Sequence, residues 1–157
     1  MIPYKMDSGI VNKKARRDYQ IIKEYTAGIV LSGAEVKSIR QGRIKLDQAY
    51  IRFLDSGPVL VNAFIPAYQY ADEQDYDPSR TRKLLLTKKE IIEIQTKLRS
   101  SRGLTVIPIV CYNKGRYIKF RLALARGRKK FDKKSIEKKK AIERQQKAEI
   151  KKALTRG

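Results

Sequence analysis

The chain of 157 residues is strongly basic, with 37 Lys and Arg against 16 Asp and Glu and a net charge of +21. Its length suits one domain with an extension, and a hydrophobic content of 41% is enough for one modest core. One cysteine and no histidine exclude a disulfide framework, a Cys/His nucleophile pair and a zinc knuckle. The charge favours a polyanionic partner, because neutralised phosphates release condensed counterions.

The N-terminal part of the chain predicts one long strand. Residues 1–11 carry few core-forming signals, and residues 12–18 form a short basic approach. Residues 19–31 are rich in β-branched and aromatic side chains, which predicts a strand, or two strand segments bent by a bulge near Gly28. Glycines then bracket residues 33–42, where Val36 and Ile39 fall at helical spacing and predict a short helix. Its outward side would carry basic side chains: Lys37, Arg40 and Arg43.

The middle of the chain predicts a hairpin, an acidic loop and a helix. Residues 50–54 and 59–63 are joined by a turn signal and form the hairpin. Residues 66–78 hold an acidic cluster without the spacing or central glycine of a calcium loop, so we expect a surface loop whose carboxylates counter Arg80, Arg82 and Lys83. Thr87 and Glu90 form a capping box that opens a helix, and Gly103 ends it.

Two strands, 104–112 and 116–125, complete the predicted domain around a turn at residues 113–115. In the second strand one set of alternating side chains should enter the core: Ile118, Phe120, Leu122 and Leu124. The other set should form a basic face: Tyr117, Lys119 and Arg121, with Ala123 and Ala125. We expect Cys111 to be a buried structural thiol, and we do not take Tyr19, Tyr25 and Tyr50 as RNA contacts. The pattern predicts a mainly β fold with a few helices, an oligonucleotide-binding-like closed barrel; an α+β sandwich is the alternative.

The last residues, 126–157, hold fourteen Lys and Arg against four Asp and Glu, a local charge of +10. Their few aliphatic side chains are too irregularly spaced for a continuous helical stripe, so the segment cannot bury itself. We therefore expect a basic tail that seeks nucleic acid and cannot fold alone. No run approaches the length of a bilayer span, and no signal-peptide core precedes the domain, so we expect a cytoplasmic protein.

Catalytic signals are lacking. The sequence contains neither the GxxxxGK[ST] nor the GxGxxG phosphate-binding pattern, and its clustered carboxylates lie on one loop without a histidine. We expect no enzyme, no cofactor and no metal. What remains is a surface of Lys and Arg with interleaved tyrosines, the composition expected where phosphates are neutralised and bases stack.

Four stretches in chain order resemble the motifs of the SmpB family, the SsrA-binding small proteins B of bacteria: residues 12–19 (NKKARRDY), 33–42 (GAEVKSIRQG), 77–86 (DPSRTRKLLL) and 125–134 (ARGRKKFDKK). The resemblance covers nearly the whole chain. It implies a barrel that binds the tRNA-like domain of transfer-messenger RNA and helps deliver it to stalled ribosomes for trans-translation. It also implies an RNA-binding domain over residues 1–131 and a basic tail over residues 132–157. This tail would be disordered in isolation and become helical in the empty message channel beside the decoding centre. A monomer without membrane contact is expected, which catalyses no bond change.

The resemblance further implies which residues form the RNA face or its supports: Asn12, Lys13, Lys14, Glu35, Lys37, Arg40, Arg80, Thr81, Arg82 and Lys83. A carboxylate facing phosphates would be repelled, so we expect Glu35 to orient Lys37, Arg40 or another basic neighbour, or else to accept from a ribose or base donor. The ribosome-binding element of the tail is implied to be Arg128, Lys129, Lys130, Asp132, Lys133 and Lys134.

At three positions the sequence departs from the family pattern. Lys134 stands where the family has Arg, so a planar two-point phosphate contact is not implied there. Thr26 replaces an RNA-proximal Glu, and Thr87 replaces an Asn found in some members. Other functions are consistent with the composition: a structural ribosomal or general RNA-binding protein with a basic extension, a tRNA-handling or nuclease-type enzyme using the acidic loop, and a membrane-surface protein.

Overall fold

The computed structural model describes residues 9–71, 74–128 and 144–146. The chain divides into two units, Met1–Gly127 and Arg128–Gly157. In the second unit residues 144–146 are helical and exposed. Most of the predicted ribosome-binding element lies outside the described residues: Lys129, Lys130, Asp132, Lys133 and Lys134. The predicted boundary between residues 131 and 132 therefore stays a prediction.

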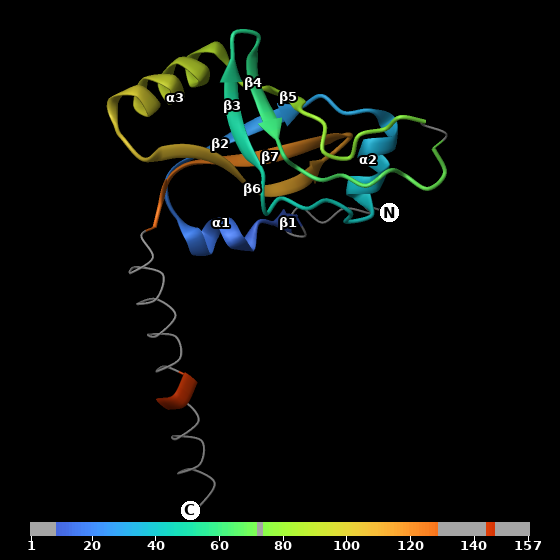
Figure 1. The fold of residues 1–157 in the computed structure, drawn as a ribbon, viewed down its shortest axis with the longest axis horizontal. Coiled ribbons are helices and arrows are strands. Elements are labelled where there is room, and N and C mark those ends of the chain that lie inside the picture. Colours follow the sequence, from blue (N-terminus) through green and yellow to red (C-terminus); the bar gives the residue numbers. More distant parts are fainter. Residues whose placement is uncertain (1–8, 72–73, 129–143, 147–157) are drawn as a thin grey trace, which may run out of the picture. The chain divides into compact units, whose positions relative to one another are not determined.

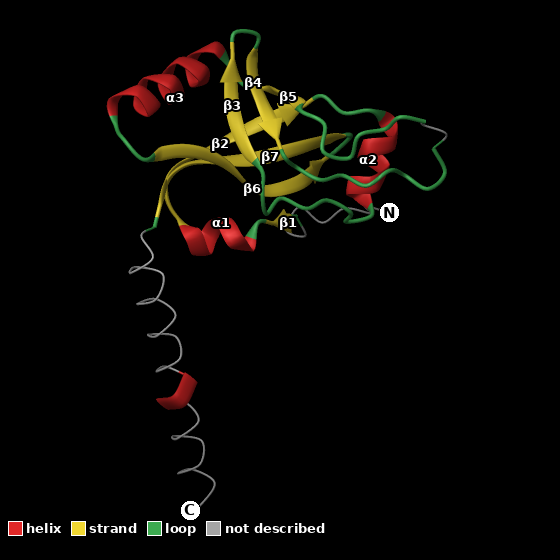
Figure 2. Ribbon diagram, viewed as in Figure 1, coloured by secondary structure: helices red, strands yellow, loops and turns green. Residues whose placement is uncertain are grey.

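The first unit is built on an antiparallel sheet whose described strands follow the order β1-β6-β7-β2-β5-β4-β3 (Figures 1 and 2). Their bounds are Ile10–Val11 (β1), Tyr19–Ile29 (β2), Tyr50–Leu54 (β3), Gly57–Val61 (β4), Arg82–Leu85 (β5), Leu104–Lys114 (β6) and Tyr117–Gly127 (β7). The predicted hairpin and the two predicted C-terminal strands are confirmed. Gly115, in the turn between β6 and β7, has φ +61°, a conformation that glycine adopts without steric cost.

The long strand β2 is continuous, and its irregularity lies elsewhere than predicted. The register against β7 shifts between Ile21 and Lys23, so the β-bulge is at the start of the strand and the prediction of a bulge near Gly28 is wrong. Gly28 is regularly paired with both Lys119 and Leu85. A side chain at Gly28 would lie 3.3 Å from the Leu85 Cβ, so the close approach of β5 accounts for the glycine.

A closed barrel is not confirmed. In the described residues the sheet ends at β1 on one side and at β3 on the other, and no ladder joins β3 to β1 or β6. β3 nevertheless packs against β6, because the long strands β6, β7 and β2 carry enough twist to bring the far edge of the sheet back. The coarser prediction, a mainly β fold with a few helices, is confirmed.

In the described residues of this unit three helices accompany the sheet: α1 (Lys13–Asp18), α2 (Gly33–Arg40) and α3 (Lys88–Ser100). The predicted capping box of α3 is confirmed, with the Glu90 N–H donating to Thr87 Oγ1 and the Thr87 N–H donating to the Glu90 carboxylate. α2 opens on a second capping box, formed by Ser32 and Glu35. No helix among the described residues is long and apolar enough to cross a membrane.

The helix α1 was not predicted, because its six residues are mostly charged. It begins at Asn12, whose Oδ1 accepts a hydrogen bond from the Ala15 N–H at 3.1 Å. The Asn12 Nδ2 also donates to Leu46 O at 3.1 Å and to Pro108 O at 2.9 Å. This one buried side chain therefore joins the start of α1 to the segment before β3 and to β6.

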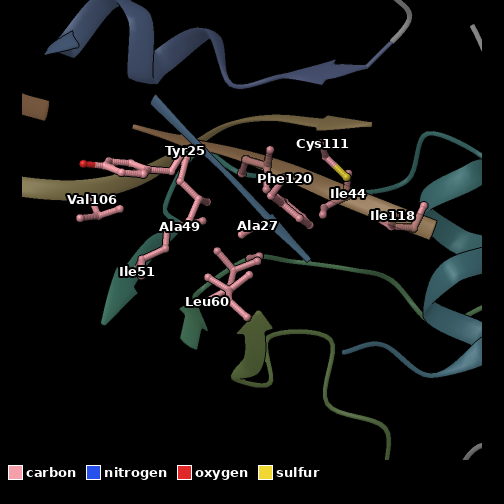
Figure 3. Close-up of a cluster of buried hydrophobic side chains, with 14 of the residues drawn as sticks. Tyr25, Ala27, Ile44, Ala49, Ile51, Leu60, Val106, Cys111, Ile118 and Phe120 are labelled. Atoms are coloured by element: carbon pink, nitrogen blue, oxygen red, sulfur yellow. The ribbon is translucent and has the colours of Figure 1, made fainter. Parts of the chain in front are cut away.

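The main core lies where the strands curve around one another. Figure 3 shows buried side chains of several strands gathered there, among them Ala27 of β2, Leu60 of β4 and Phe120 of β7, each fully buried. Cys111 is also buried, and burial raises the pKa of its thiol to about 12, as expected for an inert structural cysteine.

The second face of β7 differs in part from the prediction. Tyr117 and Arg121 are exposed, as predicted, but Ala123 and Ala125 are buried in a small separate cluster with Ala15 of α1. The helix covers the end of this face, and the small alanine side chains let it approach closely. The predicted basic face is therefore limited to the first half of the strand.

The helix α3 is held to β2 by polar contacts around Glu93. The Tyr25 hydroxyl donates to Glu93 Oε1 at 2.8 Å, and Lys23 and Lys97 form ion pairs with the same carboxylate. Hydrogen bonds from Lys23, Tyr25 and Lys97 lower the pKa of Glu93 to about 2. Burial and the neighbouring carboxylate raise the pKa of Tyr25. These contacts fix the N-terminal half of the helix against the sheet and leave its other side to solvent.

Candidate nucleic-acid interface

A buried carboxylate organises the basic surface beside α2. Glu35 is 1% exposed, and its Oε2 accepts from Arg82 Nε at 2.7 Å and from Arg80 Nε at 3.0 Å. A second contact joins Arg80 Nη2 to Glu35 Oε1, which also accepts from the Ser32 N–H at 2.9 Å. The Tyr76 hydroxyl donates to Ile65 O at 2.8 Å and lies 3.3 Å from Glu35 Oε2. We call these residues, Glu35, Tyr76, Arg80 and Arg82, the Glu35 cluster.

The Glu35 carboxyl remains ionised at neutral pH despite its burial. Burial alone raises its pKa, but the hydrogen bonds from Arg80, the Ser32 N–H and Arg82 outweigh that effect and bring the pKa to about 2. Burial of the Tyr76 hydroxyl, together with the negative charge of Glu35, raises the pKa of Tyr76. The cluster is thus a fixed anion surrounded by donors, a stable arrangement for a buried charge.

Arg82 is a supporting residue rather than a surface residue. It is 0% exposed and donates to Ala63 O at 2.7 Å and to Pro78 O at 3.0 Å, in addition to Glu35. Its guanidinium therefore joins the strand β5, the segment after β4 and the acidic loop. The predicted role of Glu35 in orienting a basic neighbour is consistent with this geometry, and the partners that the structure gives it are Arg80 and Arg82.

Around this cluster the predicted site residues of α2 and β5 reach solvent. Lys37 is exposed, and its ammonium lies 5.3 Å from the centre of the Tyr68 ring. Thr81 and Lys83 are exposed, whereas the Arg80 side chain is 37% exposed beside the buried carboxylate. Because Lys83 alternates with the buried Arg82 along β5, its side chain lies on the opposite face of the strand.

A shallow groove of about 350 Å³ continues from α2 to the β6–β7 turn. Gly28, Val36 and Leu85 contribute apolar surface, and the turn contributes Arg116 and Tyr117. Tyr117 is 70% exposed, and the Arg40 Nη2 donates to Arg116 O at 3.1 Å, so α2 is tied to this turn. An apolar floor beside cations and an exposed aromatic ring suits stacking of bases next to their phosphates.

Sequence reasoning did not assign Arg116 or Leu85 to the interface. The signal that could have found Leu85 is its place as an exposed leucine in a strand that alternates buried and exposed positions. Arg116 follows the turn glycine and carried no comparable signal.

The other predicted RNA-binding residues lie at α1, apart from α2 in Figure 1. Asn12 is buried and fully used in structural hydrogen bonds, so within the interface it can act only as a support. Lys13 is exposed and Lys14 is half-buried. The structure therefore separates the predicted residues into two groups, one at α1 and one around the Glu35 cluster. Of the predicted tail element, the described part of the chain includes only Arg128, which is half-buried.

The curved antiparallel sheet and its cationic surfaces define a small β-sheet protein of the nucleic-acid-binding class. A family model described as SmpB protein matches residues 9–152. The chain therefore belongs to the SmpB family.

The chain is also similar in sequence to SsrA-binding proteins of several bacteria. An SsrA-binding protein of Sulfurihydrogenibium sp. (strain YO3AOP1) is 42% identical over 134 residues, covering 85% of this chain and 88% of the relative. The SsrA-binding protein of Enterococcus faecalis (strain ATCC 700802 / V583) is also 42% identical, over 85% of this chain and 86% of the relative. That of Mycoplasma mycoides subsp. mycoides SC is 41% identical over 138 residues, covering 87% of this chain and 93% of the relative.

A solved structure has the same fold. It is described as "tmRNA-SmpB: a journey to the center of the bacterial ribosome", and its matching chain is 41% identical to this one. The alignment covers 78% of this chain and 85% of that chain, with a TM-score of 0.65.

Proposed function

We propose that this protein binds the tRNA-like domain of transfer-messenger RNA and delivers it to stalled ribosomes for trans-translation. The observation that carries the proposal is the family match over residues 9–152, supported by the solved relative, which is described with tmRNA and the bacterial ribosome. The chain would act as a monomeric RNA-binding protein of the cytoplasm, where ribosomes work. The bond changes of rescue would be left to the ribosome, so no catalytic role is assigned to the chain.

The burial of the predicted residues supports a division between RNA contacts and supports. Lys37, Thr81 and Lys83 are exposed, and Arg80 and Arg40 are partly exposed, so these side chains can meet phosphates and riboses. Glu35 and Arg82 are buried and hold the loop and strand that present Arg80. At α1, Lys13 and Lys14 would contact RNA, with Asn12 as their support.

The tail would act on the ribosome. We propose that residues 1–131 recognise the RNA and that residues 132–157 bind ribosomal RNA near the decoding centre. The ribosome-binding element would span the junction between the two: Arg128, Lys129, Lys130, Asp132, Lys133 and Lys134. The charge of +10 over residues 126–157 supports this division, because the remaining residues still hold a net charge of +11 for the RNA. We also retain the oligonucleotide-binding-type barrel as a proposal, because β3 packs against β6.

A competition assay tests the proposal against its main rival, a general RNA-binding protein. The full chain is titrated with transfer-messenger RNA, bulk tRNA and ribosomal RNA at one stated salt concentration. Preference for transfer-messenger RNA is expected, and equal affinity for all three would favour the rival. Deleting residues 132–157 should then leave RNA affinity within about tenfold, or 1.4 kcal/mol, and abolish tagging of stalled products. Intact tagging by the truncated chain would contradict the proposed role of the tail.

A further inference from the structure

A second cavity, of about 340 Å³, lies beside α1 and shares no lining residue with the Glu35 cluster. Its size is near the lower end of the range for small-ligand sites, about 300–1,000 Å³. Its wall comes from the starts of α1 and β2, the segment leading into β3, the residue after β4, and β6. Eight of its lining residues carry polar side chains: Asn12, Lys14, Tyr19, Asp47, Gln48, Tyr50, Asn62 and Thr105.

The cavity is held open by contacts within the protein. The buried Asn12 amide donates to Leu46 O, immediately before Asp47, and to Pro108 O of β6, so two sides of the cavity are tied together. On the far side Asn62 has φ +62°, a left-handed conformation that non-glycine residues seldom adopt. The cavity is therefore a fixed part of the fold that a ligand would find already formed.

Apart from Asn12, whose amide forms the hydrogen bonds described above, most polar side chains of the lining are not used by the described part of the fold. Within residues 9–71, 74–128 and 144–146, no hydrogen bond reaches the side chains of Asp47, Gln48, Asn62 or the two tyrosines. Tyr19 and Tyr50 are half-buried, so each offers part of a ring as well as a hydroxyl group. Unpaired polar groups around two aromatic rings can pair with a ligand without giving up any hydrogen bond of the fold.

The lining of this cavity has no net charge, unlike the strongly basic chain as a whole. Lys14 is its one cation and Asp47 its one anion, so the lining is neutral in a chain of net charge +21. A free anion would gain little in such a site. A planar neutral group with one phosphate attached suits it better, because the ring can pack on tyrosine while Lys14 meets the phosphate and the amides meet the edge of the ring.

We propose that this cavity binds one nucleotide extruded from a single-stranded segment of RNA. A carboxylate only accepts hydrogen bonds, so Asp47 would select a base that presents donors at its edge. Guanine presents two adjacent donors on its Watson–Crick edge and is the preferred base, whereas uracil presents one donor between two acceptors. The proposal rests on the proposed function only for its RNA partner.

Nuclear magnetic resonance with short RNA tests the proposal directly. The ¹⁵N-labelled full chain is titrated with the single-stranded pentanucleotides UUGUU and UUUUU. The guanine-containing strand should shift the amide signals of Asp47, Gln48, Asn62 and Thr105 in a saturable way and should bind more tightly than the uridine strand. Shifts spread over the basic surface, with no response at these four amides, would overturn the proposal.

A pair of charge-matched variants separates base recognition from general attraction. Asp47→Ala and Asp55→Ala both remove one exposed carboxylate, and Asp55 lies in the β3–β4 turn outside the cavity. Each raises the net charge by one, which alone would tighten RNA binding. Asp47→Ala should instead weaken binding of UUGUU by about fivefold or more, while Asp55→Ala leaves it unchanged or tighter. Equal tightening in both variants would overturn the proposal.

The cavity experiments can be interpreted whether or not the protein prefers transfer-messenger RNA. The pentanucleotides contain no tRNA-like domain, so a chain that fails to prefer transfer-messenger RNA can still show the cavity response. Conversely, loss of the cavity response leaves the contacts around the Glu35 cluster intact. Gln48→Ala supplies a second variant, with the exposed Gln20→Ala on β2 as its control, and the spectrum of each variant reports whether the fold is kept.

Discussion

Replacing Glu35 by Gln should destabilise the domain strongly, because the change removes the anion that holds two arginines. Glu35 and Arg82 are both buried, and removing one partner of such a pair leaves an uncompensated charge, at a cost of about 3–5 kcal/mol. The lowered pKa of Glu35 gives a second value for the contribution of this carboxylate to the free energy of unfolding. Its fall from 4.5 to about 2 corresponds to about 3 kcal/mol of linked stability, at about 1.4 kcal/mol for each pKa unit.

The pH dependence distinguishes this pairing from a loss of packing. Because the folded-state pKa of Glu35 lies below its unfolded value, its contribution is complete above about pH 4.5 and is lost as the pH falls toward 2. The stability gap between the wild-type chain and Glu35→Gln should therefore be largest near pH 7 and should narrow between pH 4.5 and 2. Urea unfolding followed by far-ultraviolet circular dichroism measures the gap at each pH.

Glu90→Gln is the matched control. Glu90 has the same place in the capping box of α3 that Glu35 has in α2, but no arginine pairs with it among the described residues. Since Gln also satisfies a capping box, Glu90→Gln should cost less than about 1 kcal/mol at any pH. If Glu35→Gln costs no more than Glu90→Gln, or if its cost is the same at pH 7 and pH 2.5, the assigned role of the buried ion pairs is wrong.

Three further predictions follow from contacts described above. Asn12→Asp keeps the cap of α1 but loses the donations to Leu46 and Pro108, so it should cost about 2–4 kcal/mol in urea unfolding; a cost under 1 kcal/mol would contradict it. Phe120→Ala empties the centre of the core and should cost about 3–5 kcal/mol in the same assay. RNA binding by the domain should weaken with salt, with a log–log slope of about −4 to −5 if about six phosphates are contacted, and a slope near zero would show that stacking or shape dominates.

Elements with a strong local signal were predictable from sequence. The capping box at Thr87 and Glu90 marks α3, and the glycines around residues 33–42 mark α2, because caps and glycines act over a few residues. The predicted core set of β7 (Ile118, Phe120, Leu122 and Leu124) is confirmed for the same reason, since each of these side chains is two positions from the next. These signals need no knowledge of the distant chain.

Features that depend on distant contacts were missed or misplaced. The helix α1 has no apolar stripe, and it is stabilised by Asn12 through backbone groups 34 and 96 residues away. The run from Arg80 to Lys83 suggested a uniformly exposed basic face, yet Arg82 is buried. Its burial follows from the alternation of β5, but the partner that makes a buried arginine stable, Glu35, is 47 residues earlier in the chain.

The candidate site residues could be named from the sequence, but the sequence did not show which of them reach solvent and which are buried supports. Sequence placed Asn12, Glu35 and Arg82 together with exposed lysines in one set, because a motif does not distinguish a side chain that touches a ligand from one that holds its neighbour. Only burial makes that distinction, and it separates these three residues from Lys13, Lys37 and Lys83.

The strand that leads into the tail is paired on both sides. β7 forms ladders with β6 and with β2 along nearly its whole length, from Tyr117 to Gly127. A pull along this strand therefore loads two rows of hydrogen bonds in shear, so that many must break together instead of opening one after another. Under the proposed role of the tail, a force applied by the ribosome would enter the domain through β7, the strand that these two ladders hold on both sides.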